Sequence, residues 1–153
     1  MKIIGFSIKK FLAEVKESKR TNLEVTSNLN LEEIKELRIE PTKQQSILIS
    51  FKFYVEYKPN VARIEIKGQL ILLDDENKTS EIMKAWKNKK LLEEIKLPIL
   101  NFILEKCNIR SLGIEEELGL PLHIPLPKLG ARKIQENQEK EESKEKKPAN
   151  YTG

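Results

Sequence analysis

Two side chains could do acid-base or nucleophilic chemistry near neutral pH: the single histidine, His123, and the single cysteine, Cys107. His123 stands in a proline-rich segment between Leu122 and Ile124, where we expect an exposed or hydrogen-bonded loop residue. Cys107 falls near the end of a predicted helix, and no base close in sequence would activate its thiol, so a small buried hydrophobe is expected. The sequence therefore predicts no catalytic residue, and we expect a protein that is not an enzyme.

Carboxylates and metal ligands are the other candidates for chemistry. Glu115, Glu116 and Glu117 are adjacent, but neighbours on a helix point in different directions, which favours a solvated face over a catalytic pair. One histidine and one cysteine cannot complete a four-ligand zinc site without carboxylates or a second chain. No glycine-rich phosphate-binding pattern occurs. We therefore expect neither a metal nor a cofactor.

Large apolar side chains outside the predicted core are better candidates for function. Tyr54 falls on the polar face of its predicted strand, and Trp86 lies in a predicted helix. The segment 120–129 carries prolines at positions 121, 125 and 127, which predicts an extended arm with apolar side chains. Such an arm must lie on a surface.

A long β-hairpin over Ser46–Leu73 must position these residues. Apolar and polar side chains alternate from Ile47 to Tyr57 and again from Ala62 to Leu72, with Lys58-Pro59-Asn60 as the turn. The alternation predicts two paired strands with one buried face.

Two more strands are expected before this hairpin. Ile3–Val15 changes its apolar face near Lys9-Lys10, which a β-bulge would correct. Leu23–Leu29 alternates cleanly, and the two strands together suggest a hairpin. The segment 30–37 has an N-cap residue and apolar residues at helical spacing, so we expect a short helix there.

The second half of the chain is predicted to be helical. Thr79 or Ser80 is the expected N-cap of a long helix, Pro98 is expected to kink or break it near residue 97, and a second, short helix is expected over residues 111–118. Between Ile99 and Leu104 the helix is apolar on nearly every face, which predicts a contact with another subunit. The expected interface residues are Ile99, Phe102 and Ile103.

Composition limits the class of protein. The 153 residues suit a single domain, which we place at 1–130, followed by a disordered charged tail at 131–153. The 28 basic and 24 acidic residues are interspersed, so nucleic acid is a possible partner but not a favoured one. The single cysteine, and the lack of a long apolar run or a secretion signal, predict a cytoplasmic protein that does not insert into membranes. Its richness in Lys and Glu has a thermophile character.

The order of these elements resembles that of the SecB-like chaperone family over residues 3–129. The resemblance is carried by Gly68 and Trp86, by the apolar helix at 99–104, and by the ending from Leu118-Gly119-Leu120-Pro121 to Ile124-Pro125-Leu126-Pro127. It implies an α+β fold in which a four-stranded (or slightly larger) antiparallel sheet packs against a long C-terminal helix plus a short helix. It also implies a homo-oligomer, dimer or tetramer, with holdase activity and no nucleotide.

In that family, clients lie in long apolar grooves, and the clients expected here are unfolded or nascent polypeptides. The implied client-binding residues are Tyr54, Trp86, Leu120, Leu122, Ile124 and Leu126. The alternative is a structural or accessory subunit of a larger assembly, such as a ribonucleoprotein or a ribosome-associated complex. A third class is a small-molecule-binding domain, or an enzyme whose carboxylates converge only in the fold.

Overall fold

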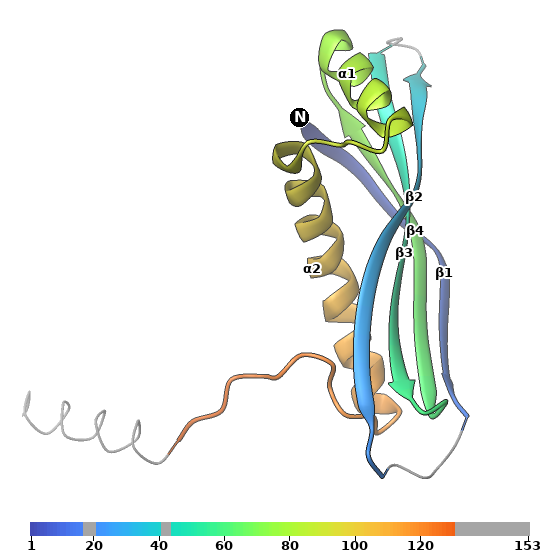
Figure 1. Cartoon of the computed structure of the whole chain (residues 1–153), viewed down its shortest axis with the longest axis vertical. Helices are drawn as coiled ribbons and strands as arrows, with labels where there is room; N and C mark the ends of the chain where they lie inside the picture. The colour runs from blue at the N-terminus through green and yellow to red at the C-terminus, as the bar shows by residue number, and fades with distance from the viewer. Residues whose placement is uncertain (17–20, 41–43, 131–153) are drawn as a thin grey trace, which may run out of the picture. The chain divides into compact units, whose positions relative to one another are not determined.

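The computed structural model describes residues 1–16, 21–40 and 44–130, so the tail expected at 131–153 lies outside the described residues. Residues Met1–His123 form one compact unit. It contains strands β1 (Lys2–Val15), β2 (Glu24–Ile39), β3 (Gln44–Lys58) and β4 (Ala62–Leu73), then helices α1 (Glu76–Lys87) and α2 (Glu93–Glu117) (Figure 1). Residues 124–130 contain no helix or strand and are described by themselves. The expected α+β class with a four-stranded antiparallel sheet is confirmed.

The strands lie in the order β1-β4-β3-β2, and all pairs are antiparallel. The predicted β3–β4 hairpin is present, with its turn at residues 59–61. The expected pairing of β1 with β2 is wrong, because these strands form opposite edges of the sheet. The two central strands are β3 and β4, whose uninterrupted alternating apolar residues are fully buried there.

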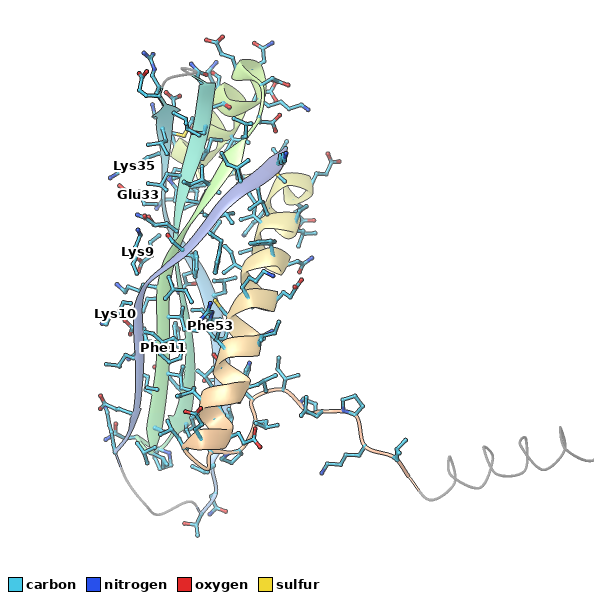
Figure 2. All side chains as sticks on the ribbon, turned by 180° about the vertical axis from the view of Figure 1, so that it is seen from behind. Lys9, Lys10, Phe11, Glu33, Lys35 and Phe53 are labelled. Atoms are coloured by element: carbon cyan, nitrogen blue, oxygen red, sulfur yellow. The ribbon has the colours of Figure 1, made fainter. Side chains whose placement is uncertain are left out.

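A β-bulge in β1 does what the sequence predicted. The register with β4 shifts between Ile8 and Lys10, so that Ile8 lies opposite Gly68 and Phe11 lies opposite Ile66. Phe6 and Ile8 therefore face the same side of the sheet as Phe11, and β1 bends where Lys9 and Lys10 lie (Figure 2). Another register shift, between Ile3 and Gly5, leaves Ile4 exposed.

The short helix expected over residues 30–37 is wrong, because β2 runs through this segment. A bulge in β2 shifts the register with β3 between Leu31 and Glu33, so that Leu31 pairs with Phe51 and Ile34 with Ile49. The bulge puts residues three apart on one face of the strand, which imitates helical spacing in the sequence.

Gly68 is required where β4 passes under a core aromatic ring. A Cβ atom at this position would lie 2.6 Å from Phe51 Cζ and 2.5 Å from the carbonyl oxygen of Ser7. No side chain fits there, so the glycine allows the Phe51 ring to pack on the β4 backbone.

The helix boundaries differ from those expected. Helix α1 begins earlier, with Asp75 as the N-cap whose carboxylate accepts the Lys78 N–H at 2.9 Å. The chain leaves the helix after Lys87, where Lys89 has a φ of 53°, and not near residue 97. Pro98 lies inside α2, near its start, where the missing N–H forfeits a single hydrogen bond.

Helix α2 is one continuous helix of 25 residues that includes the short helix expected at 111–118. Gly119, directly after the helix, has a φ of 62°. The N–H of Leu120 donates to the Glu115 carbonyl and the N–H of Gly119 to the Glu116 carbonyl, which is the Schellman pattern. This turn reverses the chain, so that residues 121–123 return along the last turns of α2.

The core lies between the sheet and α2, which runs along one face of the sheet, while α1 packs on β2 and β3 at one end (Figure 1). The alternating residues of β3 and β4 point into this layer and are fully buried. From α2, Ile99, Ile103 and Cys107 enter the same core.

Candidate functional site

A groove lies between the edge strand β2 and the two helices, with a volume of about 760 Å³. Five half-buried apolar side chains line it: Leu29, Leu31, Trp86, Leu91 and Leu100. Asn30, Glu32, Lys87, Lys89 and Lys96 complete the lining, and we call this site the β2–helix groove.

The fold explains why apolar side chains are left half-exposed there. Leu29 and Leu31 lie opposite Phe53 and Phe51, on the side of the sheet that α2 covers, but β2 is an edge strand and has no further strand beside it. The connection between α1 and α2, residues 88–92, contributes Leu91 to the lining of the groove. The resulting surface can bind aliphatic and aromatic side chains by burial alone.

The charge of this groove is one-sided. Lys87, Lys89 and Lys96 are exposed, and no ion pair within the described ranges engages them. Glu32, the acidic lining residue, has a partner outside the groove, because the Lys67 ammonium lies 3.6 Å from its carboxylate. The groove therefore combines an apolar floor with a positive rim.

A second cluster of polar side chains is buried beside the end of α2. Glu115 Oε1 lies 2.6 Å from His123 Nδ1, and Glu115 Oε2 accepts the backbone N–H of His123 at 3.2 Å. The other ring nitrogen, Nε2, lies 3.0 Å from the side-chain oxygen of Asn108. The side chains of Glu115 and His123 are 0% and 1% exposed. We call this arrangement the Glu115–His123 clasp.

The clasp also includes the neighbouring strand. The Tyr57 hydroxyl donates to the Pro121 carbonyl at 2.6 Å, and the ring of Phe53 meets the His123 ring edge to face at 6.1 Å. Burial, together with the nearby Glu115 carboxylate, raises the pKa of Tyr57. The clasp thus fixes residues 121–123 on both β3 and α2.

The clasp bears on two expectations from the sequence, one for His123 and one for Glu115. His123 is hydrogen-bonded, which is one of the two expected states, but it is buried rather than exposed. Glu115 does not lie on a solvated face, whereas Glu116 and Glu117 do. Because both ring nitrogens of His123 are occupied and the ring is covered, the cluster positions the chain and offers no open reaction centre.

The outer face of the sheet carries a charge network. Glu65 is 7% exposed and is contacted by Lys10, Lys52 and Arg63 at 3.2, 3.8 and 3.1 Å. Burial opposes ionisation of Glu65, but the hydrogen bond from Lys10 and the surrounding positive charges outweigh it and hold the pKa of this carboxyl below its ordinary value.

Tyr54 belongs to this outer face. The Arg63 guanidinium lies 5.5 Å from the Tyr54 ring centre, and the Asn28 side-chain amide donates to the Tyr54 hydroxyl at 3.3 Å. Since Phe53 and Val55 point into the core, Tyr54 faces away from α2 and from the β2–helix groove.

The structure therefore separates the residues that the resemblance grouped together. Trp86 lines the groove and Tyr54 lies on the opposite face of the sheet. Leu120 is 5% exposed and belongs to the core, because the turn at Gly119 folds it under α2, while Leu122 is 36% exposed. Ile124 and Leu126 lie in the C-terminal part, and the Leu126 side chain is exposed.

The residues expected at a subunit interface are occupied within the chain. Ile99 and Ile103 are fully buried against the sheet, so they are not available to a partner. Phe102 is half-buried and packs edge to face on Phe6 with a ring distance of 5.8 Å. The neighbouring apolar side chains of the helix, Leu100 and Leu104, are half-buried.

The remaining candidates for chemistry are Cys107 and groups of metal-ligating side chains. Cys107 is buried, as predicted, and its burial raises the pKa of the thiol to about 12, although Arg110 opposes the shift. Across residues 1–16, 21–40 and 44–130, no three His, Cys, Asp or Glu side chains come together as a metal site would need. In these same ranges no helix is both long and apolar enough to cross a membrane.

The fold of this chain is similar to that of a known protein, whereas its sequence is not. No family model and no curated protein matches the sequence. Among solved structures, the fold is similar to that of the Mycobacterium tuberculosis Rv1957 SecB-like chaperone, solved in complex with a ChAD peptide from the Rv1956 HigA1 antitoxin. The TM-score is 0.52 at 13% identity, over 84% of this chain and 90% of the other. This likeness shows the fold alone, and it agrees with the SecB-like fold expected from the order of the elements.

Proposed function

We propose that this chain is a non-catalytic holdase that binds unfolded or nascent polypeptides in the cytoplasm, without nucleotide or cofactor. The observation that carries the proposal is the β2–helix groove, an open surface of half-buried leucines and one tryptophan. Such a surface binds many sequences through buried area and demands no single hydrogen-bond pattern. The similar SecB-like chaperone binds a peptide, which supports the same role on this fold.

The test is aggregation of a heat-denatured model protein, measured by light scattering at equimolar subunits. Trp86→Ser and Leu31→Ser each remove a large side chain from the groove, and burial of such a side chain contributes about 1.5–3 kcal/mol. Client affinity should therefore fall about tenfold or more. Leu97→Ser is the matched control, because Leu97 is 52% exposed on α2 and does not line the groove.

Circular dichroism and thermal melting must first show that each variant is folded. If the parent does not slow aggregation, the holdase proposal is wrong. If RNA also binds with a steep dependence on salt, the accessory-subunit alternative replaces it. Equal loss of activity in Leu97→Ser and Trp86→Ser would show that the groove is not the binding surface.

We also propose that the chain self-associates, at a surface other than the one expected from the sequence. Strand β1 is an edge strand whose outer side has no partner within the described residues, and Phe11 is 42% exposed on it. Next to it on α2, Ile109 is 63% exposed, and the two side chains line one cavity of about 650 Å³. A second copy would cover both the strand edge and these apolar side chains.

Light scattering at tens of micromolar tests this proposal. The parent should be a dimer or larger, and Ile109→Glu should shift it towards the monomer. A parent that stays monomeric would overturn it.

A further inference from the structure

We infer that the β2–helix groove prefers extended segments in which acidic residues flank apolar ones. The inference rests on the proposed function, and it names the class of polypeptide that the site selects. Its basis is the combination of an aliphatic floor with three rim ammonium groups that no described carboxylate neutralises.

The positions of the three lysines determine the geometry of the preference. Lys87 ends α1, Lys89 lies in the connection, and Lys96 lies in the first turns of α2, so the charges follow the helical wall of the groove. The opposite wall is β2, where Glu32 already has Lys67 as a partner. An apolar segment on the floor would therefore have positive charge along one side, which favours carboxylates next to its apolar residues.

A polypeptide fits these observations better than a nucleic acid does. Four of the five apolar lining residues are leucines, and Trp86 is the single aromatic ring among them. Single-stranded nucleic acid binds by stacking successive bases on aromatic rings, which this lining does not provide. The leucines instead favour contact with aliphatic side chains of a polypeptide, and the lysines can then interact with the charged residues that flank them.

The experiment uses three synthetic peptides with the same leucine-rich centre and with flanks of glutamate, glutamine or lysine. Their binding to the full chain is measured by fluorescence anisotropy at low salt and at 0.5 M salt. Exposed charge pairs each contribute modestly, so we expect the glutamate-flanked peptide to bind about tenfold more tightly than the lysine-flanked one. High salt should reduce the difference.

The decisive variant is Lys87→Gln/Lys89→Asn/Lys96→Gln, in which asparagine suits the left-handed backbone at position 89. It should bind all three peptides about equally. Lys84→Gln is the matched control, since Lys84 is exposed on α1 but does not line the groove, and it should keep the full preference.

Several results would overturn the inference. If the parent binds the three peptides equally, the inference is wrong and the holdase proposal stands without a preference for charge. If the parent binds no peptide and does not suppress aggregation, the proposed function is wrong as well. Displacement of the glutamate-flanked peptide by oligouridylate at stoichiometric concentration would assign the lysines to RNA. A changed molar mass of the triple variant would assign the groove to a second copy of the chain.

Discussion

Replacing Glu115 with alanine tests the Glu115–His123 clasp most directly. The substitution removes the acceptor of the hydrogen bonds from His123 N and Nδ1, and bonds to a charged group contribute about 1.5–3 kcal/mol each. Because both side chains are almost fully covered, water cannot replace the lost partner without opening the site. We expect the free energy of unfolding to fall by about 3–5 kcal/mol, which is large against a usual total of about 5–15 kcal/mol.

Urea unfolding followed by circular dichroism measures this change, and two variants bracket it. Glu115→Gln keeps the shape and one acceptor, so it should lose about 1–2 kcal/mol. Glu116→Ala removes an exposed carboxylate one residue away and should change stability by less than about 0.5 kcal/mol.

A double-mutant cycle of Glu115→Ala with His123→Ala separates the clasp from simple loss of packing. The coupling energy should be about 2 kcal/mol or more. A coupling below about 0.5 kcal/mol would refute the reasoning, since the two side chains would then act independently. Hydrogen exchange gives a local readout, because the His123 amide should exchange at least tenfold faster in Glu115→Ala.

Further predictions concern two glycines and the outer face of the sheet. Gly68→Ala should lower the free energy of unfolding by about 1–3 kcal/mol in urea titrations, because the new Cβ meets Phe51 and the Ser7 carbonyl oxygen; an unchanged midpoint would contradict the close packing. Gly113→Ala, inside α2 near its C-terminal end and with open space around it, should instead raise stability by about 0.5–1 kcal/mol in the same titration, and a loss would argue against the helix there. The carboxyl of Glu65 has a folded pKa below its ordinary value of 4.5, so its stabilising effect is present above that pH and is lost as the pH falls through the folded value. Melting temperatures of the parent and Glu65→Gln should therefore differ at pH 7 and converge in acid; a constant difference would contradict the charge network.

The sequence predicted the sheet well where one physical signal dominated. The alternation in β3 and β4 has a period of two and no interruption, so the hairpin and its buried face were readable. The bulge at Lys9 in β1 could also be predicted, because the change of apolar face coincides with two lysines. In β2 the bulge falls between Leu31 and Glu33, and the shifted spacing of the apolar residues matches that of a helix. Only the pairing with β3 determines that this segment is a strand.

The candidate sites were less predictable because they depend on contacts distant in sequence. Trp86 was singled out, but Leu29 and Leu31 join it only because β2 ends up at the edge near both helices. For the clasp there was a local signal. Gly119 reverses the chain between Glu115 and His123, and a Schellman turn brings residues on its two sides together.

The strand order has a consequence for how the chain acquires its structure during synthesis. β2, β3 and β4 form a meander of sequential neighbours, whereas β1 pairs only with β4, so that Lys2 meets Leu73 and Val15 meets Ala62. β1 leaves the ribosome before β4 and is therefore without its partner until β4 has followed. Non-local pairing of this kind slows folding and leaves a strand edge exposed in the meantime. The nascent chain of this protein thus passes through a state with an unpaired apolar strand.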